Sequence, residues 1–361
     1  NTVTQAGTGI NQNGAITING NGSSATFRSN NNINQNGLIS MVANTSGHAS
    51  AVTYDVSRGD KASTVVINTP LTIAAGSTSR IDYNMFASGA VLNAGALPAI
   101  PGIITIDNTF GAAAVGATPA SGFLTTSNLT LATTSNAIVI NSGQPLVGQY
   151  GVTLRAASNG TTASNAILIN DNITSASGSV VLDGVAGSGY AVYYPSTSYG
   201  LSGQSISVIG RNLGTSTIAP VSIGKLSILA GGGSLSVIGN KTTAGGAAGV
   251  VQNGNITSLS SGGSMLFASN NVITQNGTIS VAANTSGHAA EVTYDTTAGN
   301  KLSVINAGVI AFSAGSTDAI NYKNLASGAE IIVNSSLNVP GAIILDNTWL
   351  NGASGGITPA N

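Results

Sequence analysis

The chain has 361 residues, of which 6 % are charged and 4 % are aromatic, and its formal net charge is −1. A charge this close to zero excludes the basic surface that binds nucleic acid, and the mean hydropathy of +0.28 excludes a disordered polar chain. The absence of cysteine excludes disulfides, thiolate metal sites and cysteine nucleophiles. We find no apolar run long enough to span a bilayer and no leader at Asn1, so we expect a soluble or already processed segment without membrane insertion.

A segment near the amino terminus is repeated 240 positions later. Residues 29–55 read SNNNINQNGLISMVANTSGHASAVTYD, and residues 269–295 read SNNVITQNGTISVAANTSGHAAEVTYD. The match extends far beyond these segments, which predicts one continuous solenoid of three half-units: A (1–121), B (122–240) and A repeated (241–361). The repeated A is not followed by a second B, which favours a window cut from a longer array.

Short stretches that alternate between apolar and polar residues occur along the chain. This period of two is typical of β-strands, whereas no long stretch shows the 3.6-residue spacing of a helix. Gly, Asn and Ser separate the stretches, as expected for turns. In chain order they include AITI (15–18), LISMVA (38–43), SISVIG (205–210) and SLSVIG (234–239).

The triplet QNG recurs after 23 residues, at 12–14 and 35–37, and again at 252–254 and 275–277. Short strands and turns at such a period predict an all-β fold, a parallel β-helix (β-solenoid) with coils of about 20–23 residues. Inward Val, Ile, Leu and Ala are expected to form stacked columns, and Asn side chains in the turns are expected to stack their amides between coils. Because each coil adds about 4.8 Å, the predicted product is an elongated rod.

The coils resemble those of the filamentous haemagglutinin-like adhesins, the exoproteins that Gram-negative bacteria export by two-partner secretion. The resemblance rests on NxITxNGxISV at 271–281 and its earlier counterpart, SNAILINDNIT at 164–174 and GGGSLSVIGNKTT at 231–243. It implies a right-handed β-helix shaft, an extracellular location at the bacterial cell surface, and a role in adhesion, aggregation or biofilm structure. It carries over no functional residues, because the shared pattern describes coils and not a catalytic site.

Tyr190, Tyr193, Tyr194 and Tyr199 form the single aromatic cluster of the sequence. Exposed aromatic rings stack on sugars, so these four residues are our candidate contact with a glycan or a protein partner. The alternative is a tyrosine ladder packed against a loop, with hydroxyls that reach water or backbone groups.

Two other clusters suggest chemistry only at first sight. His48, Tyr54 and Asp55 bring a base, a phenol and an acid close in sequence, but an extended segment places His48 and Asp55 about 20 Å apart. Asp107 and Asp346 each offer one carboxylate to Ca²⁺, which is a thin ligand set. We expect turns in both places, and neither a catalytic site, a metal nor a cofactor.

The most serious enzymatic alternative is a polysaccharide lyase or hydrolase. It needs paired carboxylates, or acids beside Arg or Lys, and the best local group is Asp55, Arg58, Asp60 and Lys61. In the second copy Ala298 and Asn300 replace the arginine and the second aspartate, which favours a solvated turn.

The sequence therefore predicts a non-enzymatic structural shaft segment. A self-assembling filament or sheath subunit remains an alternative, and the glycan-cleaving β-helix is a weaker one. The partners we expect are other copies of the chain, associated side by side or end to end, and host or matrix glycans. Few like charges are present to repel neighbouring shafts, which favours packing through uncharged Asn, Ser and Thr faces.

Overall fold

The computed structural model divides the chain into two compact units, Asn1–Gly184 and Val185–Asn361. Its regular structure is entirely β-strand in the part that it describes, and that part contains no helix able to cross a membrane. The predicted half-unit boundaries at 121 and 240 stay a prediction. The described residues are 8–20, 22–29, 31–41, 51–55, 64–69, 71–73, 80–84, 91–94, 103–108, 123–126, 138–140, 142, 145–148, 151–158, 165–187, 189–214, 217–230, 233–242, 244, 246–260, 263–282, 290–300, 302–312, 319–323, 330–336, 342–346 and 357–359.

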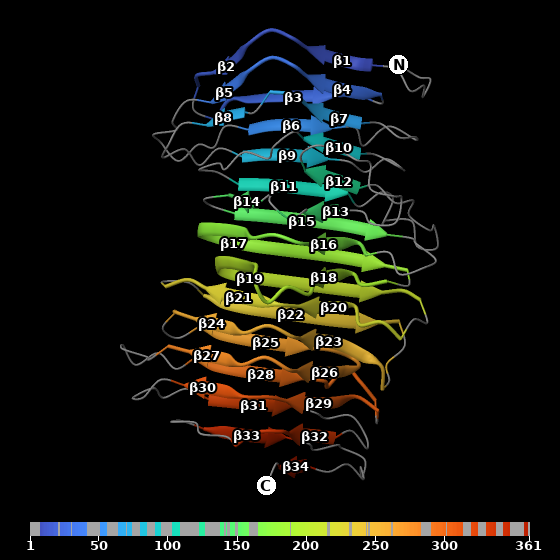
Figure 1. The fold of residues 1–361 in the computed structure, drawn as a ribbon, viewed down its shortest axis with the longest axis vertical. Coiled ribbons are helices and arrows are strands. Elements are labelled where there is room, and N and C mark those ends of the chain that lie inside the picture. The colour runs from blue at the N-terminus through green and yellow to red at the C-terminus, as the bar shows by residue number, and fades with distance from the viewer. Residues whose placement is uncertain are drawn as a thin grey trace. The chain divides into compact units, whose positions relative to one another are not determined.

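The first unit stacks parallel strands in three main sheets, and each coil adds one strand to successive sheets (Figure 1). The first sheet holds β1 (Thr8–Gln12), β4 (Asn32–Gln35), β7 (Thr64–Ile67), β10 (Val91–Ala94) and β12 (Phe123–Thr126). The second holds β2 (Ile16–Ile18), β5 (Ile39–Met41) and β8 (Leu71–Ile73). The third holds β3 (Ser24–Arg28), β6 (Ala51–Asp55), β9 (Arg80–Asn84), β11 (Ile103–Asn108) and β15 (Gly151–Ser158).

Two further parallel pairs belong to the later part of this unit. β13 (Ile138–Ile140) pairs with β16 (Ile167–Ile169), and β14 (Leu146–Val147) pairs with β17 (Ile173–Ala186). The last two residues of β17 fall in the second unit.

The second unit repeats the three-sheet plan. Its first sheet holds β18 (Val192–Tyr194), β20 (Val221–Ile223), β23 (Ala248–Gln252), β26 (Val272–Gln275), β29 (Val304–Ala307), β32 (Glu330–Val333) and β34 (Ile357–Pro359). Its second sheet joins the start of β19 (Gly200–Asn212) to β21 (Lys225–Ile228), β24 (Ile256–Ser258), β27 (Ile279–Val281) and β30 (Ile310–Phe312). Its third sheet joins the rest of β19 to β22 (Ser234–Lys241), β25 (Ser264–Ala268), β28 (Glu291–Asp295), β31 (Ala319–Lys323) and β33 (Ile343–Asp346).

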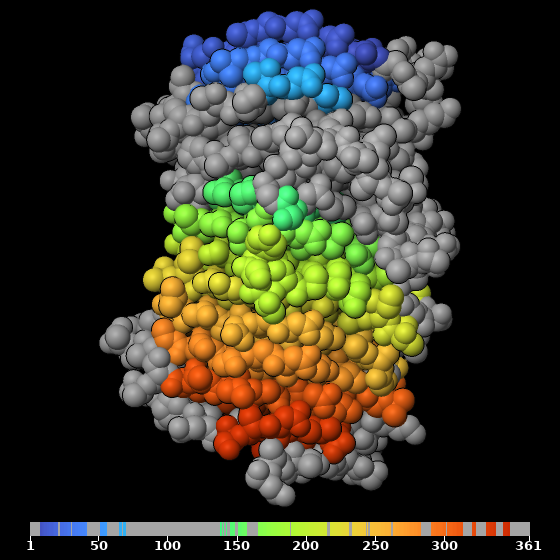
Figure 2. Space-filling view, in the orientation of Figure 1, coloured from blue at the N-terminus to red at the C-terminus, as the bar shows by residue number. Residues whose placement is uncertain are grey.

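Each unit is thus a parallel β-solenoid, which confirms the predicted fold class. In Figure 2 the coils of the second unit follow one another as bands from yellow-green to red across the visible face. The expected strands are present: Ile16–Ile18 and Ile39–Met41 are β2 and β5, and the stretches at 205–210 and 234–239 lie in β19 and β22. The handedness stays a prediction.

The coil length differs from the prediction. Val250 pairs with Ile273, which lies 23 positions later, as the QNG spacing indicates. Ile273, however, pairs with Ile305, 32 positions later, and Val221 pairs with Val250, 29 positions later. The limit of 20–23 residues was wrong because a solenoid holds its strands in register and accommodates extra residues between them, as between Met41 and Ala51.

The interior is built from columns of equivalent side chains. Along β22 every second side chain is buried, including Leu235 and Val237. Val237 pairs in register with Val208 on one side and Phe267 on the other, so one apolar column runs through successive coils. Burial of these columns is the main stabilising term, because each apolar side chain stacks on a similar one above and below.

Candidate functional site

The predicted tyrosine cluster lies in the second unit, around β18. The rings of Tyr190 and Tyr193 stack with centroids 4.3 Å apart and planes inclined by 21°. Tyr193 is the middle residue of β18, so it points outward while Val192 and Tyr194 point inward. Both stacked tyrosines are half-buried and keep part of their surface exposed to solvent.

Tyr194 does not belong to this surface, and its prediction as a contact residue was wrong. Its side chain is 0 % exposed, and its hydroxyl donates a hydrogen bond to the carbonyl oxygen of Tyr199. For this residue the packed-ladder alternative is right. The alternation of Val192, Tyr193 and Tyr194 along a strand was the sequence signal that could have separated the buried tyrosine from the outward one.

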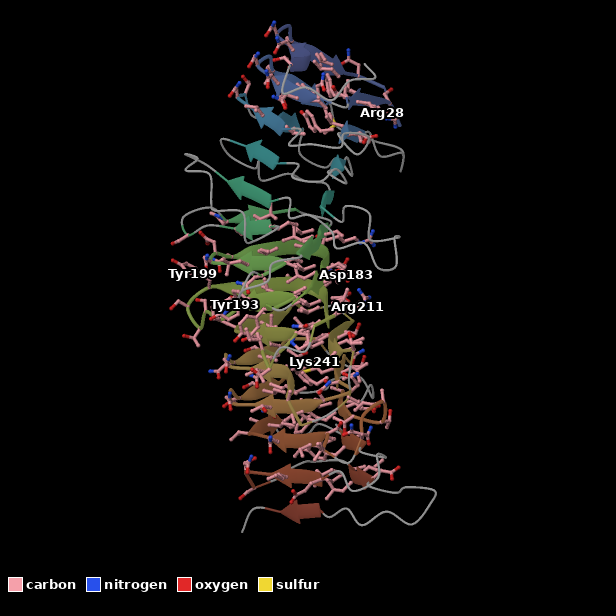
Figure 3. The ribbon with its side chains drawn as sticks, turned by 90° about the vertical axis from the view of Figure 1, so that its right-hand side faces the viewer. Arg28, Asp183, Tyr193, Tyr199, Arg211 and Lys241 are labelled. Atoms are coloured by element: carbon pink, nitrogen blue, oxygen red, sulfur yellow. The ribbon has the colours of Figure 1, made fainter. Side chains whose placement is uncertain are left out.

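Tyr199 is positioned by a short loop whose polar groups bond to one another. The Ser196 hydroxyl oxygen accepts hydrogen bonds from the backbone N–H groups of Ser198 at 3.1 Å and Tyr199 at 3.0 Å. The Ser196 carbonyl accepts from the N–H of Lys225 at 3.1 Å, which ties the loop to the next coil. Figure 3 shows Tyr193 and Tyr199 on the same side of the second unit, away from Arg211.

We define the tyrosine surface as Tyr190, Tyr193 and Tyr199. Burial raises the pKa of Tyr190, and the neighbouring Tyr193 raises it further. Phenol rings offer an apolar face and a hydrogen-bonding edge. The chemistry suits noncovalent contact with a sugar ring or with another aromatic or apolar group.

The QNG turns form a second, buried set of polar contacts, which the sequence reasoning did not recognise. The Gln35 amide nitrogen donates to the carbonyl oxygens of Gly37 at 3.1 Å and Thr69 at 2.7 Å. Its amide oxygen accepts the hydroxyl proton of Tyr54. Gln35 and Tyr54 are both 0 % exposed, so this pair satisfies polar groups inside the core.

The second copy reproduces this arrangement. The Gln275 amide nitrogen donates to Gly277 at 2.9 Å and Val309 at 2.8 Å, and its oxygen accepts from the hydroxyl of Tyr294. The ring of Tyr294 stacks on Phe267 at 5.2 Å, as that of Tyr54 stacks on Phe27 at 5.4 Å. The 240-residue sequence repeat is therefore a repeat of packing geometry.

The asparagines of the QNG turns lie outside and stack between coils, as predicted. Asn36 donates to Asn13 at 2.8 Å and accepts from Asn68 at 2.6 Å. In the second copy Asn276 donates to Asn253 at 3.0 Å. The glycine follows from crowding, because a Cβ on Gly37 would overlap the backbone carbonyl oxygen of Gly14.

The predicted acid–base cluster is only partly within the described residues. Asp55 forms an ion pair with Arg28 at 2.7 Å, and the hydroxyl of Tyr54 donates its proton to the Gln35 amide oxygen. In the second copy Asp295 accepts from the N–H of Thr297 at 2.8 Å, which is a turn contact. His48, Arg58, Asp60, Lys61 and His288 lie outside the described residues.

The two aspartates considered for Ca²⁺ lie in strands, Asp107 within β11 and Asp346 at the end of β33, so the turn expected to hold them was wrong. Asp107 pairs with Arg155 between β11 and β15, and Asp346 pairs with Lys323 between β33 and β31. In the part of the chain that the structure describes, no three His, Asp or Glu side chains gather into a metal-binding group.

Comparison with known proteins adds no relative. No family model, no curated protein and no solved structure matches the chain.

Proposed function

We propose that this chain is a structural shaft segment of an extracellular bacterial adhesin or surface fibre, with a role in adhesion, aggregation or biofilm structure. The proposal is supported by a solenoid interior made of repeated columns, and by the resemblance of the coil sequences to haemagglutinin-like exoproteins.

The observation that carries the proposal is the identical use of the repeated residues in both copies. The pairs Tyr54–Gln35 and Tyr294–Gln275 make the same buried hydrogen bond at equivalent places. Residues retained for coil stacking are what a fold extended by duplication requires. A repeated catalytic or binding motif would instead place reactive groups on a surface.

The first test is the mass of the intact, fully denatured protein recovered from cell surfaces, combined with electron microscopy and antibody labelling of intact cells. A surface-labelled species many times 35.3 kDa that forms thin rods supports the shaft of a large adhesin. A species near 35.3 kDa that still forms long filaments favours the self-assembling subunit. Labelling confined to the cell interior refutes both.

The tyrosine surface is our candidate for contact with a glycan. Its stacked pair is held by β18 and its third ring by the loop at Ser196, so the rings are ordered before a ligand binds. Ordered aromatic groups lose little entropy on binding. The double variant Y190A Y193A lacks both stacked rings. We expect it to be retained less than the parent chain on columns of immobilised neutral and sulfated polysaccharides.

The control for this test is Ser227→Ala, on the outward side of β21, which should retain binding. Equal retention by the double variant and the parent chain refutes the glycan contact. That the chain is not an enzyme also stays a prediction, and release of new reducing ends from the same polysaccharides would overturn it.

A further inference from the structure

The Asn–Gly peptide bonds of the QNG turns are sites of possible deamidation. The hydrogen bonds between asparagines of successive turns, called here the asparagine ladder, hold the reacting groups in place. In a flexible chain the backbone nitrogen of the glycine attacks Cγ of the preceding asparagine. The new N–Cγ bond closes a cyclic imide, the Cγ–Nδ2 bond breaks, and ammonia leaves. Water then opens the ring to leave aspartate or isoaspartate. Glycine permits this reaction best because it places no side chain against the attacking nitrogen.

Both reacting groups at Asn36–Gly37 are held in place by hydrogen bonds. The Gly37 N–H donates to the backbone oxygen of Gln12 at 3.0 Å and to its side-chain oxygen at 3.1 Å. The Asn36 amide is held by Asn13 at 2.8 Å and by Asn68 at 2.6 Å. Attack requires the side chain to leave this ladder and the Gly37 N–H to lose its acceptors.

The copy at Asn276–Gly277 is held less firmly. Its Gly277 N–H reaches the Gln252 backbone oxygen at 3.4 Å, and its amide donates to Asn253 at 3.0 Å. The carbonyl of Val309 accepts from the Gln275 amide, as the carbonyl of Thr69 accepts from the Gln35 amide. Gly308, which precedes Val309, is therefore the equivalent of Asn68. Glycine has no side-chain amide with which to continue the ladder.

We propose that stacking of the QNG turns locks these Asn–Gly bonds against deamidation, and that Asn36 is locked more firmly than Asn276. The ladder then has a chemical role besides its structural one, since it keeps the amides of these turns unmodified. Each hydrogen bond that must open slows attack by about fivefold. The bifurcated bond of the Gly37 N–H, counted as one, and the two bonds of the Asn36 amide together slow attack by about a hundredfold relative to the unfolded chain.

The test follows deamidation of the intact chain by peptide mass spectrometry, in mildly alkaline buffer with and without urea. Trypsin releases residues 29–58, in which Asn36–Gly37 is the one Asn–Gly bond, and residues 242–301, which contain Asn276. We expect native Asn36 to react slowest, native Asn276 faster, and the two to react alike in urea. Equal rates for Asn36 in the native and unfolded chain overturn the proposal.

Asn68→Ala provides the sharper variant, because Asn68 is exposed and its loss removes one bond from the Asn36 amide. It should accelerate reaction at Asn36 by about fivefold and leave Asn276 unchanged. Asn11→Ala is the matched control: it removes the exposed bond to Asn34, at 3.0 Å, and touches neither reacting group. An equal acceleration by both variants, or none by Asn68→Ala, overturns the assignment of the lock to the asparagine ladder.

Discussion

The Tyr294 hydroxyl donates to a glutamine. In each neighbouring coil the equivalent pair lacks either the hydroxyl donor or the glutamine acceptor. Tyr294 bonds Gln275, whereas the coil before has Gln252 with Phe267 and the coil after has Ala307 with Tyr322. Gln275 and Ala307 follow directly on the registered pair Thr274 and Asn306. Among the described residues, the amide oxygen of Gln252 and the hydroxyl of Tyr322 are therefore buried without a hydrogen-bond partner.

Removing the hydroxyl should have opposite effects at the two tyrosines. Tyr294→Phe loses one buried hydrogen bond, while the Gln275 oxygen keeps the bond from the Gly308 N–H at 3.0 Å. We expect the free energy of unfolding to fall by about 1 kcal/mol. Tyr322→Phe removes a hydroxyl that pays desolvation for no partner, so the free energy should stay constant or rise by up to about 2 kcal/mol.

The assay is urea unfolding of the two variants and the parent chain, followed by circular dichroism. Both positions lie in adjacent strands of one sheet with rings 5.1 Å apart, so each variant is the other's control for loss of a phenol oxygen. Comparison of midpoints is sufficient, because repeat proteins need not unfold in one step. Losses of the same sign and size at both positions would refute the assignment of the Tyr294–Gln275 bond.

Three further predictions concern the same interior. Phe267→Tyr should supply the hydroxyl that Gln252 lacks and raise the unfolding midpoint, whereas a lower midpoint would show that the column has no room for the oxygen. Gly37→Ala should cost about 1–3 kcal/mol through overlap with the Gly14 carbonyl, while Gly14→Ala, whose Cβ would meet nothing within 4 Å, should be tolerated; equal losses in thermal unfolding would contradict the crowding argument. Burial raises the pKa of Tyr322 and of Tyr294, and the neighbouring Tyr322 raises the pKa of Tyr294 further. The folded chain therefore keeps these protons at a pH where unfolded phenols, of pKa about 10, release them. The contribution of these two phenols to the free energy of unfolding should be fully present below pH about 10 and should fall as the pH rises above that value. Urea midpoints measured across this pH range test the prediction, and a midpoint that rises with pH would contradict it.

Much of the fold was accessible from local pattern. Alternation in stretches such as 205–210 and 234–239 identified strands correctly, because each strand has one face in the core. The QNG spacing predicted a coil of 23 residues, and Val250 and Ile273 are paired at that distance. The coils from Val221 to Val250 and from Ile273 to Ile305 are longer, because residues between strands change the spacing in sequence without changing the register of the stack.

The candidate site was less accessible. The tyrosine cluster was found, but strand phase places Tyr194 in the core and Tyr193 on the surface, and a one-residue shift reverses that assignment. The buried amides of Gln35 and Gln275 were missed because glutamine is usually a surface residue. Their partners, Tyr54 and Tyr294, lie 19 residues along the chain, and nothing in local sequence indicates that they meet.

The sequence by itself determined the all-β class, the repeat and the turn residues, because alternation, duplication and the preferences of Asn and Gly are local properties of the chain. Only the tertiary structure decided which polar side chains are satisfied. Hydrogen bonds such as Tyr294–Gln275 and Asn36–Asn68 form between strands that the coil brings together, and their presence depends on register across successive coils. Ala307 stands where the preceding coils have glutamine. The strand pattern is unchanged there, but the acceptor that the hydroxyl of Tyr322 needs is missing.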